Sequence, residues 1–175
     1  MEPGPMMSVH DFAVNWHRLL FEGHMPETWR LMTDDFRRVV AQSALSQRHA
    51  AGQEVDWIVE ELAVPEPTHD DVGEFWDAAR AILQRSCGFP PDQVGAGQTA
   101  RFEAPAYETV RLWVLEDLAV DLDTGELYLP DKASARAIGL IASFEEPGTW
   151  RIAGLEAVMV PGWPPTVLWE PPPQV

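Results

Sequence analysis

The hydrophobic pattern of this chain changes once, near Tyr107. Before that residue, apolar side chains recur at the three- and four-residue spacing of helices; after it, short apolar runs between turn residues indicate strands. Helices followed by antiparallel strands predict an α+β domain in which the helices pack on one face of the sheet. The 175 residues suit a single domain, 1–175. Within it we expect a loose N-terminus (1–7), a folded body (8–160) and a Pro/Trp-rich tail (161–175).

The N-terminal half contains two helix starts close together. Ser8 is placed to cap a first helix that stops at Gly23. Pro26 suits the first turn of a short second helix, and Thr33 then caps a third, which has acidic residues in its first turn. Starts this close predict a bend, so that the third helix leaves at a new angle and the helices wrap around a curved surface.

Later segments are predicted from local signals. Residues 54–64 suit either a short helix or a strand, and a longer helix is expected from a cap at Thr68 or Asp70 to Gly88. The Pro/Gly-rich stretch 89–105 predicts a loop. Strands are expected at 107–116, 134–144 and 149–160, with a tight hairpin at 118–129 that turns at Asp123-Thr124-Gly125.

The charge balance limits the classes of partner. The chain carries 28 acidic and 12 basic residues, a formal net charge of −16, which disfavours nucleic acid and anionic membrane surfaces as partners. An acidic surface that keeps the protein soluble explains this charge, and docking of a basic partner is the alternative. No apolar stretch is long enough to span a bilayer and no signal peptide is visible, so a cytoplasmic location is expected. The single cysteine, Cys87, excludes an internal disulfide and predicts a buried thiol.

Three segments resemble the nuclear-transport-factor-two-like superfamily, the cystatin-like cone fold that includes SnoaL-like cyclases, scytalone dehydratase and ketosteroid isomerase. They are the helix "FAVNWHRLLFEG", the bent pair "ETWRLMTDDFRRVVAQSAL" and the strand "GTWRIAGLEAVMV", within residues 8–160. The resemblance implies a curved sheet around the first helix, a conical apolar pocket with a few polar groups, and dimers formed through the sheet. It does not extend to the ketosteroid isomerase pattern of a helix-one tyrosine and two pocket aspartates, because the only tyrosines are Tyr107 and Tyr128.

Glu156 is the first candidate catalytic residue. In the strand 149–160 it is the only charged member of the row that contains Trp150 and Ile152. In an apolar cavity its pKa would rise and suit general acid or base catalysis, whereas Arg111 or Arg136 beside it would lower that pKa and indicate a structural or substrate-orienting pair. The alternative is a glutamate at the sheet edge that faces water or a partner subunit, and strand parity alone does not choose between them.

The histidines His10, His17 and His24 are spaced by seven residues, which separates neighbours by about 10 Å on a helix, too far to share one metal ion. Solvent-facing or partly buried histidines are therefore the preferred interpretation, and no metal site or cofactor is expected. His17 remains a candidate for proton transfer at a pocket mouth.

Several aromatic residues are candidates to line a pocket for a flat apolar ligand, although such residues more often belong to a core. They are Phe12, Trp16, Trp29, Trp76, Trp113 and Trp150. Because both rows of the strands are largely apolar, the sheet is expected to be covered on both faces: by helices on one, and on the other by the tail or by a second subunit in a homodimer.

Two functions remain. The first is a noncatalytic domain that binds a small apolar ligand or a protein partner, as a dimer. The alternative is a cofactor-independent pocket enzyme, such as an isomerase, dehydratase, cyclase or hydrolase, that acts on a small apolar substrate.

Overall fold

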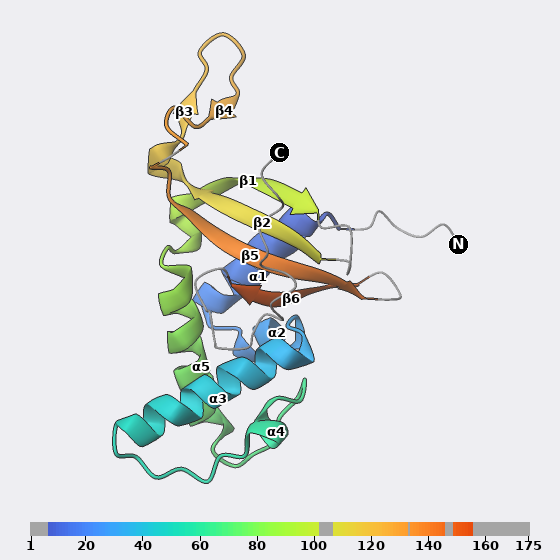
Figure 1. The fold of residues 1–175 in the computed structure, drawn as a ribbon, viewed down its shortest axis with the longest axis vertical. Helices are drawn as coiled ribbons and strands as arrows, with labels where there is room; N and C mark the ends of the chain where they lie inside the picture. The colour runs from blue at the N-terminus through green and yellow to red at the C-terminus, as the bar shows by residue number, and fades with distance from the viewer. Residues whose placement is uncertain (1–6, 102–106, 133, 146–148, 156–175) are drawn as a thin grey trace, which may run out of the picture.

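Helices packed against a four-stranded antiparallel sheet form an α+β fold, as predicted (Figure 1). The computed structural model describes residues 7–101, 107–132, 134–145 and 149–155. Within them the helices are α1 (Val9–Glu22), α2 (Met25–Arg30), α3 (Asp34–Ala50), α4 (Val59–Leu62) and α5 (Val72–Cys87). The strands of the main sheet are β1 (Val94–Arg101), β2 (Tyr107–Val114), β5 (Ala137–Glu145) and β6 (Thr149–Leu155), in the order β1-β2-β5-β6.

Helix α1 has the predicted ends. The Ser8 hydroxyl accepts a hydrogen bond from the Asp11 amide at 3.1 Å, and Gly23 ends the helix in the left-handed conformation at φ +87°. A side chain at that φ would be strained, which is why glycine stops the helix there. The buried face of α1, which includes Phe12, Trp16 and Leu20, packs into the core beneath the sheet.

The predicted bend between α2 and α3 is confirmed, and the sheet explains it. Thr33 caps α3 by accepting a hydrogen bond from the Phe36 amide at 3.3 Å. Between the helices the chain runs beside the edge strand β6: the Ile152 amide donates to the Leu31 carbonyl at 2.8 Å, and the Thr33 amide donates to the Ile152 carbonyl at 2.9 Å. The helix therefore breaks where its backbone hydrogen bonds go to the sheet instead.

The segments around α4 and α5 differ in part from expectation. Residues 54–64 contain the single helical turn α4 and no strand. The predicted cap of α5 at Thr68 or Asp70 is wrong: Asp71 is the N-cap residue and its side chain makes no capping hydrogen bond. A turn closed by the Val72 amide on the His69 carbonyl at 3.1 Å moves the start of the helix beyond both candidates. Gly88 ends α5 as predicted.

The predicted loop at 89–105 is wrong for residues 94–101, which form the edge strand β1. Antiparallel pairing with β2 outweighs the local glycine signal, since alternate residues of the strand gain backbone hydrogen bonds to β2. Gly97 in this strand lies against α1: a Cβ there would be 2.1 Å from Cδ2 of His10. Gly97, one of the glycines that suggested a loop, thus permits a close approach of strand and helix.

The register of the sheet shows which rows face the helices. Leu112 lies opposite Ile138, and Val110 opposite Leu140, in a fully buried layer. Arg111, opposite Gly139, lies on the other face and is exposed. The rows of Arg111 and of Ile138 are therefore on different faces.

A bulge in β6 breaks the simple alternation assumed for the row that contains Glu156. Ile141 pairs with Gly154 and Ala142 with Ile152, which leaves Ala153 as an extra residue. Ile152 and Leu155 consequently both belong to the core. Glu156 itself, the rest of the expected strand and the tail lie outside the described residues.

A second, two-stranded sheet forms the predicted hairpin. Strands β3 (Ala119–Val120) and β4 (Leu127–Tyr128) pair antiparallel, and Gly125 in the turn has φ +73°. The Asp121 carboxylate accepts hydrogen bonds from the Asp123 and Thr124 amides at 2.8 and 3.1 Å, which holds the turn. The hairpin projects away from the body, at the opposite end of the molecule from α4 (Figure 1).

Candidate functional site

His17 is buried and held by the backbone. Its side chain is 1% exposed, and Nε2 lies 2.9 Å from the Phe89 carbonyl oxygen. Since a carbonyl only accepts, Nε2 carries the proton and donates it. Burial lowers the pKa of His17 from 6.5 to about 4, so the ring is neutral at physiological pH. The expectation of a solvent-facing or partly buried histidine is wrong for His17, although it is right for His10 and His24.

Arg136 lies at the base of the hairpin. Its Nε donates to Oδ2 of Asp117 at 3.0 Å, and its Nη2 donates to Oδ1 of Asp117 at 2.9 Å and to Glu116 at 3.0 Å. The Arg136 backbone amide also donates to Asp117 at 2.7 Å. These bonds lower the pKa of Asp117 and raise that of Arg136, so both groups stay charged.

Phe89 is the neighbour that these two sequence candidates share. Its carbonyl accepts from His17, and the guanidinium carbon of Arg136 lies 5.6 Å from the centre of its ring. Arg111 is on the sheet face opposite the core, and Glu156 lies outside the described residues. His17 and Arg136 therefore meet through a structural residue, Phe89, and Arg111 lies apart from both.

The candidate aromatic residues occupy three different surroundings. Phe12, Trp16 and Trp29 are in the core, and the indole nitrogen of Trp16 donates to the Thr28 carbonyl at 3.1 Å. Trp76 and Trp150 are partly buried against that core, and Trp76 lies 5.5 Å from Trp29 in an edge-to-face arrangement. Trp113 neighbours Leu112 in β2 and so lies on the opposite face of the sheet. Ligand binding by these residues remains a prediction.

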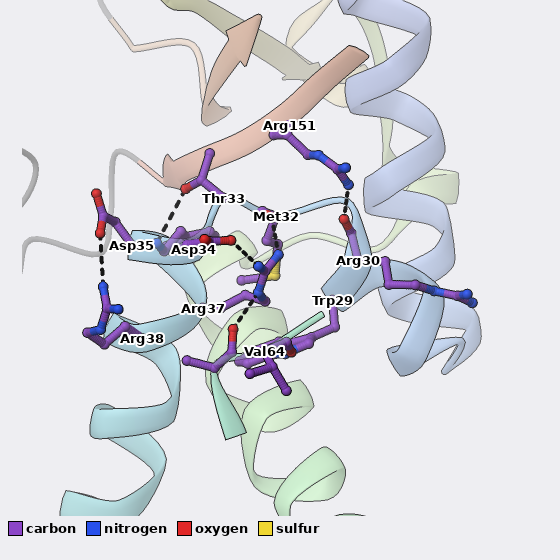
Figure 2. Close-up of polar contacts among 12 residues, drawn as sticks. Trp29, Arg30, Met32, Thr33, Asp34, Asp35, Arg37, Arg38, Val64 and Arg151 are labelled. Carbon is purple, nitrogen blue, oxygen red and sulfur yellow. Dashed lines mark hydrogen bonds and ion pairs between the residues drawn. The ribbon is translucent and has the colours of Figure 1, made fainter. Parts of the chain in front are cut away.

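A buried arginine, which sequence reasoning missed, joins the α2–α3 bend to the segment after α4 (Figure 2). Arg37 is 2% exposed; its Nε donates to the Ala63 carbonyl at 2.6 Å, and its other nitrogens donate to the Met32 carbonyl and to Asp34. Trp29 donates to the carbonyls of Leu62 and Val64 at 3.2 and 3.0 Å. These side chains tie the α2–α3 bend to the segment that follows α4, which is a structural role.

Two open depressions lie on the helical side of the molecule. One, of about 310 Å³, lies between α3 and α5 and includes Arg48 and Asp77 in its lining. The other, of about 200 Å³, is lined by three prolines together with Trp76, Arg30 and Glu66, and the last two form an ion pair at 3.3 Å. Neither depression contains His17, Arg111 or Arg136.

Cys87 is a buried thiol, as predicted, and burial raises its pKa to about 12. A thiol with so high a pKa is a poor nucleophile at neutral pH. Across the described parts of the chain, His, Cys, Asp and Glu side chains nowhere gather in groups of three or more that could hold a metal ion. In the same parts, no helix has the length and apolar character needed to cross a membrane.

The hairpin exposes most of its apolar side chains. We define the arm as residues 115–131, which include β3 and β4 and the turn between them. Leu122, in the turn, is 95% exposed, and Val120, Leu127 and Tyr128 are each about half exposed, at 52%, 49% and 50%. Val120 and Leu127 lie directly opposite one another across the two strands. Val120 and Leu127 therefore form an exposed apolar pair on one face of the hairpin, and Leu122 and Tyr128 are exposed elsewhere on the arm.

The sequence shows the hairpin but not this exposure. The stretch "LAVDLDTGELYL" predicts a tight hairpin, and only the structure shows that its apolar side chains lie in solvent. A comparison of the chain with protein-family models, curated proteins and solved structures found no match. The arm is accordingly assigned as the candidate site on its geometry and exposure alone.

Proposed function

We propose that this protein is a noncatalytic protein-binding domain that contacts its partner through the arm. The exposure of Leu122 and its apolar neighbours carries the proposal. Exposed apolar patches on soluble proteins are typical of interaction sites. Burying one leucine side chain contributes roughly 1.5–3 kcal/mol, so a partner that covers the arm gains substantial affinity.

The base of the arm supports this role. Asp117 and Arg136 make two parallel hydrogen bonds between their side chains, a pairing with defined geometry. Together with the turn held by Asp121, they fix the arm in one orientation before any partner binds. Such preorganisation reduces the entropy lost on binding. If the arm binds a partner protein, the contacts of Arg136 and His17 hold segments of the fold in place and do not position a substrate.

The wider proposal is that the body is a cone-superfamily domain that acts in the cytoplasm as a homodimer. The helices-first order and the bent helix pair support the cone resemblance. For the dimer, the sheet face that carries Arg111 and Trp113 would be the contact surface. A small apolar ligand and a pocket enzyme stay as alternatives, and native mass spectrometry would favour either of them if the protein retained a reproducible small mass.

The arm can be tested by site-specific photo-crosslinking. A benzophenone amino acid is placed at position 122 and, as a matched control, at Ile58, which is 52% exposed near α4 at the other end of the molecule (Figure 1). Irradiation of intact cells is expected to crosslink a discrete protein from position 122 and not from position 58. The crosslinked protein is then identified and purified for binding measurements.

Leu122→Ser is expected to weaken binding to that purified protein at least about tenfold, because it removes an apolar side chain worth at least about 1.4 kcal/mol when buried. Ile58→Ser should leave the affinity unchanged. Equal crosslinking from both positions, or an unchanged affinity in Leu122→Ser, would show that the arm is not the binding element.

A further inference from the structure

The arm is uniformly acidic as well as apolar. Residues 115–131 contain six carboxylates and no lysine or arginine. They are Glu116, Asp117, Asp121, Asp123, Glu126 and Asp131. An apolar surface surrounded by charge of one sign selects a partner with an apolar pocket surrounded by the opposite charge.

The carboxylates of the arm have two different roles. Glu116 and Asp117 are paired with Arg136 at the base. At the turn, Asp121 and Asp123 flank Leu122 in the sequence, and Glu126 follows Gly125; Asp123 and Glu126 are exposed. The backbone hydrogen bonds accepted by Asp121 lower its pKa, so it stays negative at neutral pH. The most exposed apolar side chain of the arm is thus accompanied by negative charge.

We propose that the arm inserts Leu122 into an apolar pocket on a basic protein, where lysine or arginine side chains at the pocket rim pair with Asp123 and Glu126. This inference rests on the proposed function and names the chemistry of the partner. The same arm on a second copy of this chain is a poor occupant, because it offers six carboxylates and no lysine or arginine to pair with them. Anionic lipid and nucleic acid are repelled for the same reason.

The test uses defined probes on the full chain. Backbone amide resonances are followed by NMR during titration with a short amphipathic helical peptide built only from leucine and lysine. A leucine/glutamate peptide and a serine/lysine peptide of the same length are the matched probes. We expect saturable shift changes confined to residues 115–131 with the leucine/lysine peptide, and none with the other two.

Two variants separate the apolar and charged contributions. Leu122→Ser is expected to abolish saturable binding of the leucine/lysine peptide. The double variant Asp123→Asn, Glu126→Gln should weaken binding about fivefold at about 50 mM NaCl, and about 500 mM NaCl should remove the difference from the wild type. The control variant Glu54→Gln, Asp56→Asn neutralises the same number of exposed carboxylates elsewhere and should bind as the wild type does.

Several outcomes would overturn the inference: equal binding of the leucine/glutamate peptide, shift changes spread over the whole surface, or an unchanged affinity in the double variant. Its failure is distinguishable from failure of the proposed function. If position 122 crosslinks a protein whose affinity does not depend on salt, the arm is a binding element but its partner is not basic. If position 122 crosslinks nothing, the proposed function itself fails.

Discussion

At the scale of single residues, His17 shows how burial changes what a histidine does. The sequence marks it for proton transfer because the ordinary pKa of histidine lies near neutrality. In the structure, burial lowers that pKa to about 4 and the Phe89 carbonyl accepts the Nε2 proton. The side chain therefore stays neutral over the physiological range and joins α1 to the segment after α5.

This pKa shift predicts a pH-dependent stability. The unfolded chain binds a proton at His17 near pH 6.5, whereas the folded chain binds it only near pH 4. The neutral, buried form of His17 therefore contributes about 3 kcal/mol to the free energy of unfolding. This contribution is fully present above pH 6.5 and is lost as the pH falls towards 4. Urea unfolding between pH 7.5 and 4.5 should show a loss in the wild type that is smaller in His17→Gln, which retains a donor but does not titrate. His24→Gln, at an exposed histidine, should keep the wild-type slope; equal slopes in all three proteins would contradict the assignment.

At the scale of elements, the α2–α3 bend depends on the Arg37 side chain within α3 as well as on the Thr33 cap of that helix. Thr33 caps α3, and the short segment between α2 and α3 pairs with strand β6. Arg37 then satisfies the carbonyls of Met32 and Ala63, which face away from water. The bend is a junction of the helices with both the sheet and the α4 segment.

Neighbouring arginines provide a matched test of this junction. Arg37→Met leaves the two carbonyls without a donor and should lower the free energy of unfolding by about 3 kcal/mol or more. Arg38→Met removes an exposed arginine that pairs with Asp35 and Glu60, and should change stability by a small fraction of that. Chemical unfolding of both variants gives the comparison. A similar loss of stability in the two variants would show that the buried contacts of Arg37 contribute little to the free energy of unfolding.

At the scale of the whole molecule, self-repulsion competes with local ion pairs. The excess of 28 acidic over 12 basic residues opposes the compact state, whereas each exposed ion pair adds little. Salt screens the repulsion between carboxylates and should therefore stabilise the protein. We expect Tm to rise by a few degrees between about 20 and 500 mM NaCl. Choline chloride at equal ionic strength is the control for specific sodium binding. A falling Tm would mean that ion pairs such as those of Arg136 dominate.

Features set by residues close in sequence were predicted from the sequence. The caps at Ser8 and Thr33, the stops at Gly23 and Gly88, and the hairpin turn at Gly125 each depend on a few neighbouring residues. The α+β class followed for the same reason, since periodicity is a local property that repeats along each element.

Features set by distant contacts were decided only by the tertiary structure. Strand β1 forms because β2 pairs with it, and Gly97 is there because α1 lies close to it. The bulge at Ala153 changes which residues of β6 enter the core, and packing buries His17 and Arg37 while it leaves Leu122 in solvent. Burial depends on which segments meet in space. The sequence therefore determines the chemistry of each residue, whereas the fold determines its environment and, with it, the candidate site.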